Sequence, residues 1–310
     1  MSYSISYNIP DNQLDTSCLL EFWEFVLERQ RVYERKCVEE RPKPWTSDPV
    51  IQNVVFTNVY RELDEGTVYL ANHVINAGLP ADELFEVLVY RLFNNRFTYE
   101  FLRHRRAHGC WEDWEHIAVL LRERKLEQQN LDNKVRLPIF SMAHMTTSMR
   151  QGGQPDKIGA ACYVLHEHWI NREKIYKQAM ACQTLEDQCK YISTLDGYGM
   201  FLAYEVVTDL HASRQLWKFD INDWANPGPG CRRAILKIWS KHEGRVDYLH
   251  FIRWLHQEQS NHINSITDDI PAYIKAWPLS LRNIEHSLCE YYKYNRAKHE
   301  GYARRKYNGT

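Results

Sequence analysis

Two glycines separated by one residue, Gly197 and Gly199, stand between two segments with helical periodicity. Glycine takes backbone conformations that are closed to other residues, and a helix that begins directly after such a turn presents free amide hydrogens to a phosphate. Gly197, Tyr198 and Gly199 are therefore predicted to contact a DNA backbone. The alternative is an ordinary turn between helices, because motifs this short recur by chance.

Acidic residues follow this turn at Asp209, Asp220 and Asp223. A glycine turn between two helices is the physical basis of a helix-hairpin-helix DNA clamp, and glycosylases of that class keep a catalytic aspartate about where Asp220 and Asp223 lie. Ala203 is small enough to let the two helices approach. A carboxylate here can accept a proton or stabilise a developing cation beside a flipped base.

The elements that must position these residues are almost all expected to be helices, because apolar residues recur with a helical period along most of the chain. Helices are expected at 16–40, 49–60, 67–78, 82–95, 111–129, 158–180, 185–194, 200–210, 231–239, 246–259 and 281–298. Only 135–140 has a strand-like pattern. The sequence therefore predicts an all-α fold over 1–310, as a single domain or as two helical lobes with the hairpin near 195–233.

Asn58 and Arg61 are three residues apart and would share one face of a helix. Glu62 could join them, and two explanations remain open for these polar residues. One is a set of ion pairs inside the protein, since buried charges tend to be paired, and the other is a grip on a phosphate or a base.

Composition limits the possible classes of protein. The 310 residues carry a formal net charge of −1, which is not the overall basic balance of a strong non-specific DNA-binding protein. The eight cysteines include no Cys-x-x-Cys pair, so reduced thiols, no metal site and a cytoplasmic location are expected. No Walker A loop, dinucleotide-binding glycine motif or His-Glu-x-x-His motif occurs.

Basic residues nevertheless cluster in two stretches, which either follow a phosphate backbone or form solvated helix faces. One stretch lies near the middle of the first half of the chain, and the other lies at the C-terminus. The members are Arg91, Arg96, Arg103, Arg105 and Arg106, and Lys293, Arg296, Lys298, Arg304, Arg305 and Lys306.

Several distant blocks together resemble one family, the alpha-glutamyl/putrescinyl thymine pyrophosphorylases, also called amino acid:DNA transferases or the helical domain associated with hydroxymethyluracil DNA kinases. The resemblance covers roughly 20–298. The blocks are Phe22-Trp23-Glu24-Phe25 with Glu28-Arg29, the segments 44–49, 56–64, 91–94 and 195–209, Asn222-Asp223, Gly228-Pro229-Gly230, and the segment 284–296.

The resemblance implies a fold related to helix-hairpin-helix glycosylases and a reaction of bacteriophage DNA hypermodification. In that reaction an amine from an amino acid or a polyamine replaces pyrophosphate on 5-(pyrophosphoryloxymethyl)uracil in double-stranded DNA. No cofactor is required, although magnesium could neutralise part of the pyrophosphate charge. No membrane is involved.

Roles follow from that reaction. The predicted proton acceptor is Asp223, Asp209 or Glu290. Pyrophosphate is predicted to bind Asn58, Arg61, Gly228, Gly230, Lys293 and Arg296. The alternatives are a helix-hairpin-helix DNA glycosylase and a non-catalytic DNA-binding partner of a hydroxymethyluracil DNA kinase.

Overall fold

The computed structural model describes residues 6–76, 78–105, 111–130, 138–141 and 153–302, and every regular element in these ranges is helical. The all-α prediction is confirmed for this part of the chain. The strand-like run at 135–140 lies mostly outside the described residues, and 138–140 form no strand.

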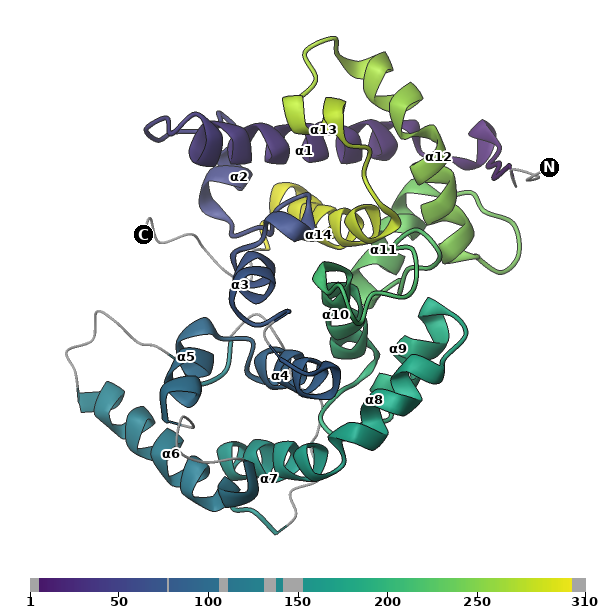
Figure 1. The fold of residues 1–310 in the computed structure, drawn as a ribbon. Helices are drawn as coiled ribbons and strands as arrows, with labels where there is room; N and C mark the ends of the chain where they lie inside the picture. The colour runs from purple at the N-terminus through teal and green to yellow at the C-terminus, as the bar shows by residue number, and fades with distance from the viewer. Residues whose placement is uncertain (1–5, 77, 106–110, 131–137, 142–152, 303–310) are drawn as a thin grey trace. The chain divides into compact units, whose positions relative to one another are not determined.

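The chain divides into two compact units (Figure 1). The first unit comprises Met1–Asp64 and Ile221–Thr310, and the second comprises Glu65–Asp220. The stretch 195–233, which the sequence presents as one region, is therefore shared between the units. The glycine turn and Asp209 belong to the second unit, whereas Asp223 and the Gly-Pro-Gly turn belong to the first.

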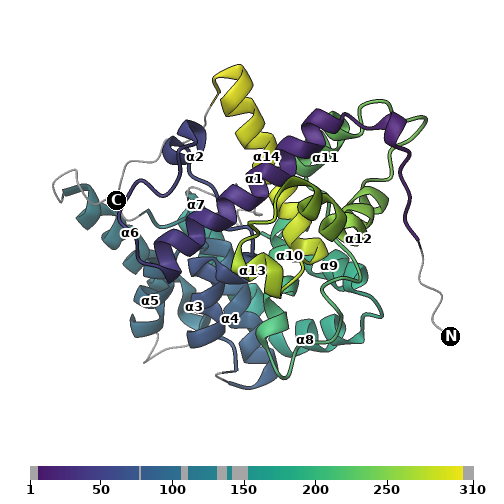
Figure 2. The ribbon, with the colours of Figure 1, turned by 90° about the horizontal axis from the view of Figure 1, so that it is seen from above.

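The first unit is built around helix α14. Helices α1, α11 and α12 all pack against it, and Figure 2 shows α1 passing over α14. Its α-helices are α1 (Thr16–Tyr33), α2 (Pro49–Asn53), α11 (Pro229–Ile238), α12 (Tyr248–Ile266), α13 (Ala272–Ala276) and α14 (Leu281–Glu300). A π-helical turn, Glu34–Val38, extends α1, and a 3-10 turn, Arg61–Leu63, follows α2. Its core contains the fully buried side chains of Phe22, Trp23, Ile235, Phe251 and Leu288.

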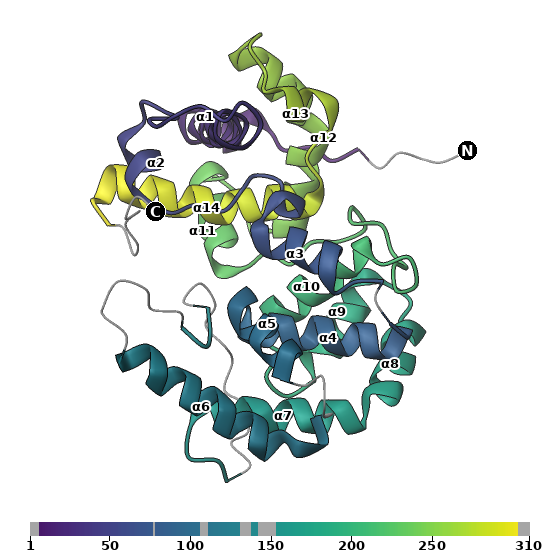
Figure 3. The same cartoon turned by 60° about the vertical axis from the view of Figure 1, so that its left-hand side comes forward.

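The second unit contains the helical hairpin. Helices α9 and α10 pack against each other, as do α6 and α7, which lie side by side in Figure 3. Its α-helices are α3 (Glu65–His73), α4 (Pro80–Phe93), α5 (Arg96–Arg105), α6 (Trp114–Asn130), α7 (Lys157–Ile170), α8 (Arg172–Ala181), α9 (Leu185–Ser193) and α10 (Met200–Asp209).

The helix expected over 49–60 is much shorter in the structure. Asp48 caps α2, accepting hydrogen bonds from the amides of Val50 and Ile51, but α2 ends at Asn53 and Val54 is extended (φ −112°, ψ 136°). In the segment that follows, the backbone of Thr57 is hydrogen-bonded to side chains and not within a helix. Its amide donates to a side chain of α14, and its carbonyl accepts from a side chain of α1. Asn58 and Arg61 are therefore on a loop and a 3-10 turn and do not share a helix face.

The helix expected over 158–180 is also interrupted. Asn171 ends α7 with φ −101° and ψ 6°, and its side chain donates to the carbonyl of Glu167. The chain continues at once as α8. Asparagine competes for backbone hydrogen bonds, which explains a break at this residue.

Candidate active site

Helix α14 carries or contacts most of the predicted site residues of the first unit. It begins at the N-cap Ser280, whose hydroxyl accepts from the amide of Asn283, and it ends at Gly301 in the left-handed conformation (φ 66°). At its first residue, the Leu281 amide donates to the side-chain oxygen of Asn222 (3.0 Å). The start of this helix therefore holds the segment that contains Asp223.

Asp223 is exposed, and its main chain is held from a second side. Arg253 of α12 donates from Nη2 to the carbonyl oxygen of Asp223 (2.9 Å). Together the two bonds fix 222–223 between α12 and the N-terminus of α14. The role of Asp223 as proton acceptor stays a prediction.

A carboxylate of α14 already lies at the Gly-Pro-Gly turn. The amide of Gly228, which caps α11, donates to Oε1 of Glu285 (3.1 Å), and Glu285 is buried. A carboxylate at a helix N-terminus satisfies free amides and complements the helix dipole. The amide of Gly228 is therefore engaged by Glu285 in this structure, and its predicted contact with pyrophosphate stays a prediction.

Gly230 lets α11 approach α14 closely. A Cβ atom on this residue would lie 2.5 Å from Sγ and 3.5 Å from Cα of Cys289. The first of these distances is too short for a van der Waals contact, so the Cys289 side chain or the helices would have to shift. The structure thus explains this glycine by packing, and its predicted contact with pyrophosphate stays a prediction.

We expect Gly230→Ala to lower the free energy of unfolding by about 1–3 kcal/mol, the usual cost of an overpacked core. Gly228→Ala is the matched comparison and should cost less, because its Cβ would meet only Glu285 Oε1 at 3.6 Å. Urea unfolding of the full chain measures both. The double variant Gly230→Ala/Cys289→Ala should recover part of the loss, and no recovery would show that the contact with Cys289 is not the cause.

Further along α14, five residues form what we call the Glu290 cluster: Arg29, Phe56, Thr57, Glu290 and Lys293. Oε2 of Glu290 accepts from the Thr57 amide (3.0 Å) and from Nζ of Lys293 (2.6 Å). Nη2 of Arg29 donates to the Thr57 carbonyl (3.2 Å). Two cations lie over the Phe56 ring, with Lys293 Nζ 4.9 Å and Arg29 Cζ 5.9 Å from its centroid.

The Glu290 cluster is partly buried, and its two charged side chains on α14 differ in solvent exposure. The Glu290 side chain is 13% exposed, whereas that of Lys293 is 33% exposed. Burial lowers the pKa of Arg29, and the charges of Glu290 and Glu28 oppose that shift. The arrangement places an accessible ammonium directly beside a carboxylate that can accept a proton.

Two polar atoms of the cluster have no hydrogen-bond partner among the described residues. They are Nε of Arg29 and the hydroxyl oxygen of Thr57, both buried. Buried donors and acceptors are usually paired by protein, water or a ligand. The Glu290 cluster therefore has capacity for a further polar group.

Asn58 and Arg61 brace the loop that carries Phe56 and Thr57. The Asn58 amide donates to Oδ1 of Asp64 (3.0 Å), and its side-chain amide donates to the Leu63 carbonyl (2.8 Å). Arg61 is buried and forms an ion pair with Asp64. The structure therefore shows the internal ion pair that the sequence left as one of two explanations, and the predicted contacts of Asn58 and Arg61 with pyrophosphate stay predictions.

The loop is also tied to α14, since the amide of Arg61 donates to the side-chain oxygen of Asn283 (3.0 Å). Asn283 and Glu290 are seven residues apart, which places them on one face of the helix. That face holds the loop at both ends. Asn58 and Arg61 thus position Thr57 and Phe56 for the Glu290 cluster.

Arg296 lies outside the cluster. Its Nε donates to Glu300 (3.0 Å), and its guanidinium carbon lies 4.0 Å from the ring centroid of Tyr302. Both partners are near the C-terminal end of α14. Its predicted contact with pyrophosphate stays a prediction.

A second charged network joins α1 to the last turns of α14. Glu21 accepts hydrogen bonds from the side chains of Tyr291, Asn295, Lys298 and His299, at 2.9–3.0 Å. Burial alone would raise the pKa of Glu21, but the hydrogen bonds from Asn295, Lys298, His299 and Tyr291 outweigh it and lower the pKa to about 2. The sequence offered no signal for this network, because Glu21 lies at least 270 residues from its partners on α14.

The lowered pKa of Glu21 predicts a pH dependence of stability. Its contribution should be complete above the ordinary pKa of 4.5 and should disappear as the pH falls toward about 2. We therefore expect the stability advantage of the wild type over Glu21→Gln, measured by denaturant unfolding, to shrink between pH 5 and pH 3. An advantage that stays constant over that range would contradict the assignment.

In the second unit, Asp209 is buried in an ion pair. Its two carboxylate oxygens accept from Nε (2.5 Å) and Nη2 (2.8 Å) of Arg91, and Glu205 lies 3.4 Å from Nη1 of the same arginine. Burial alone would lower the pKa of Arg91, but the charges of Asp209 and Glu205 outweigh it and raise that pKa. Arg91 is therefore not part of a basic surface, and Asp209 has a structural partner, while its catalytic role stays a prediction.

The glycine turn has the expected form in part. Gly197 is left-handed (φ +85°), and Gly199 caps α10 in an extended conformation that any residue adopts. The Tyr198 side chain is buried and donates to the Leu88 carbonyl (2.6 Å), so only its main chain is left to meet DNA. Ala203 is buried in α10, and DNA binding by the turn stays a prediction.

Among the residues that the structure describes, no three His, Cys, Asp or Glu side chains gather where they could hold a metal ion. The participation of magnesium stays a prediction. No helix in the described ranges is both long and apolar enough to cross a bilayer.

In the part of the chain that the structure describes, the sequence and the fold thus define an all-helical protein in which α14 carries or contacts most of the predicted site residues of the first unit. The family model described as "5-hmdU DNA kinase, helical domain" matches residues 16–304, and the chain belongs to this family. It is also similar to a protein named 5-hmdU DNA kinase from Bacillus phage SP10, with 25% identity over 286 residues. That match covers 87% of this chain and 43% of the phage protein, so the chain spans less than half of that relative's length. No solved structure matches.

Proposed function

We propose that this protein hypermodifies thymine in phage DNA, by transferring an amine onto 5-(pyrophosphoryloxymethyl)uracil with release of pyrophosphate. Membership of the 5-hmdU DNA kinase helical-domain family supports a substrate derived from hydroxymethyluracil. The observation that carries the chemistry is the Glu290 cluster, which pairs a carboxylate with an accessible ammonium at 2.6 Å.

In this reaction the amine nitrogen attacks the methylene carbon on C5 of the base. A C–N bond forms as the C–O bond to pyrophosphate breaks, and pyrophosphate leaves with that electron pair. The nitrogen then loses one proton. Glu290 accepts this proton, and Lys293 stabilises the charge of the departing pyrophosphate through a charge-assisted hydrogen bond.

The buried Arg29 supports the same step. It holds the carbonyl of Thr57, so the amide of that residue stays directed at Glu290. Asp223 is the second candidate for the proton acceptor.

A second candidate function is a DNA-binding module that works with a hydroxymethyluracil DNA kinase. The observation that favours it is the partial match to a protein named as that kinase. The 310 residues contain no Walker A loop, so kinase activity of this chain by that motif is not proposed.

The test uses DNA that contains 5-(pyrophosphoryloxymethyl)uracil, the purified chain and individual amino acids and polyamines. Mass spectrometry of the nucleosides should find an amine-substituted thymidine, with an equal amount of pyrophosphate released. Binding of the DNA without release of pyrophosphate would favour the kinase partner. Abasic sites and free modified base would instead indicate a glycosylase.

A further inference from the structure

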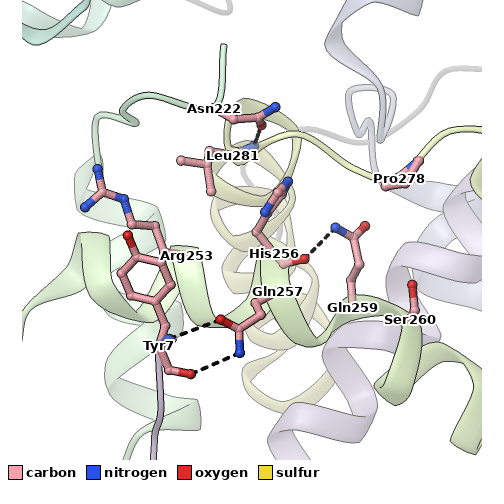
Figure 4. Close-up of a pocket in the computed structure, with 9 residues that line it drawn as sticks. All are labelled: Tyr7, Asn222, Arg253, His256, Gln257, Gln259, Ser260, Pro278 and Leu281. Carbon is pink, nitrogen blue, oxygen red and sulfur yellow. Dashed lines mark hydrogen bonds between the residues drawn. The ribbon is translucent and has the colours of Figure 1, made fainter. Parts of the chain in front are cut away.

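A pocket of about 490 Å³ lies in the first unit, beside the segment that carries Asp223 (Figure 4). Residues of α12, the start of α14 and the N-terminal segment line it. They are Tyr7, Asn222, Arg253, His256, Gln257, Gln259, Ser260, Pro278 and Leu281. No carboxylate lines the pocket, whereas the guanidinium of Arg253 does, so its electrostatic potential favours an anion.

Arg253 retains most of its hydrogen-bonding capacity. It donates one hydrogen bond, to the carbonyl oxygen of Asp223, and its guanidinium carbon lies 5.6 Å from the Tyr7 ring centroid. Within the described ranges, no carboxylate forms an ion pair with it. An arginine has five N–H donors, so donors remain for a ligand.

Two glutamines hold the pocket walls in place. Gln257 bonds the amide (3.1 Å) and the carbonyl (3.3 Å) of Tyr7, as Figure 4 shows. Gln259 is buried and makes the same pair of bonds to Leu279, at 2.7 and 3.2 Å. The pocket is therefore formed before a ligand enters, which reduces the entropy cost of binding.

The balance of charge favours a carboxylate over pyrophosphate. One guanidinium neutralises one carboxylate and can bind it through two parallel hydrogen bonds. Pyrophosphate carries several negative charges and would need more cations than this pocket offers. A polyamine is disfavoured, because it would bring positive charge to Arg253 with no acidic residue in the lining.

We propose that this pocket binds a free α-amino acid, with its carboxylate on Arg253. The assignment of that amino acid as the amine donor rests on the proposed transfer reaction. Binding here would bring the donor next to Asp223, whose main chain Arg253 already holds. In this arrangement Asp223, the second candidate, is the proton acceptor, because Glu290 lies nine residues beyond the pocket residue Leu281 along α14, about 14 Å of helix. The pocket thus selects amino acids over polyamines as the donor class.

The test is calorimetric titration of the full chain with a panel of free amino acids, with and without modified DNA. Each amino acid that binds is compared with its carboxamide. We expect the carboxamide, and the Arg253→Gln variant, to bind about 10- to 100-fold more weakly, as for the loss of a charge-assisted hydrogen-bonded pair. Arg253→Lys keeps the charge but not the bidentate geometry and should bind at an intermediate strength.

Arg232→Gln is a matched control in the same unit. Like Arg253, Arg232 donates to one main-chain carbonyl, that of Pro227 (2.7 Å), and lies over one tyrosine ring, that of Tyr248 (5.3 Å). It does not line the pocket. Amino-acid binding should be unchanged in this variant, and the melting temperatures of all variants check folding.

Two results would overturn the proposal. One is that no amino acid binds in an Arg253-dependent way, with or without DNA. The other is that inorganic pyrophosphate or putrescine, and not an amino acid, loses affinity in Arg253→Gln. Arg253-dependent binding of an amino acid without any amine transfer would support the pocket assignment and refute the proposed function. Amine transfer with an unchanged KM for the amino acid in Arg253→Gln would support the proposed function and refute the pocket assignment.

Discussion

Replacing Glu290 by glutamine is expected to slow amine transfer by about 10²- to 10⁴-fold, the usual contribution of a general base. Glutamine retains an oxygen that can accept from the Thr57 amide, so the loop that carries Thr57 should stay in place. It cannot accept the proton that the amine releases. The rate of pyrophosphate release from modified DNA at saturating amine measures the effect.

Glu300→Gln is the matched control for this substitution. Glu300 lies on the same helix and is also paired with a basic side chain, that of Arg296 (3.0 Å), but it lies outside the Glu290 cluster. Its replacement should leave transfer unchanged. Full activity of Glu290→Gln would move the role of proton acceptor to Asp223, and Asp223→Asn would then be the variant that loses transfer.

The second large effect concerns stability. Asp209→Asn is expected to lower the free energy of unfolding by about 3 kcal/mol. This value is near the lower end of the usual loss for a broken buried ion pair, because Glu205 remains beside Arg91. The Arg91 side chain is 3% exposed, so in the variant its charge stays buried and loses one of its two carboxylate partners. Chemical denaturation of the full chain is the measurement.

An exposed ion pair of the same unit gives the comparison. Glu186 and Lys190 of α9 lie 2.9 Å apart with side chains 41% and 57% exposed, and Glu186→Gln should change the stability by about 0.5 kcal/mol or less. If Asp209→Asn were as stable as the wild type but inactive in transfer, Asp209 would be a catalytic group and not a structural partner of Arg91.

The amino-acid sequence by itself determined the helical class and many of the helices. Periodicity marked α9, α10, α12 and α14 to within a few residues at most ends, because a helix is stabilised by contacts between residues three and four apart along the chain. The same local logic identified Gly197 as a residue in a special conformation and Pro49 as the first residue of a helix.

Only the tertiary structure decided what the polar residues contact. The sequence left Arg61, Gly228 and Asp209 available for substrate. In the structure Arg61 contacts Asp64 and Asn283, Gly228 contacts Glu285, and Asp209 contacts Arg91. Periodicity assigned no role to Arg29, Thr57 or Arg253, since their partners lie between 28 and more than 200 residues away. A charge buried by folding must find a partner wherever packing brings one, and periodicity along the chain carries no information about contacts at such separations.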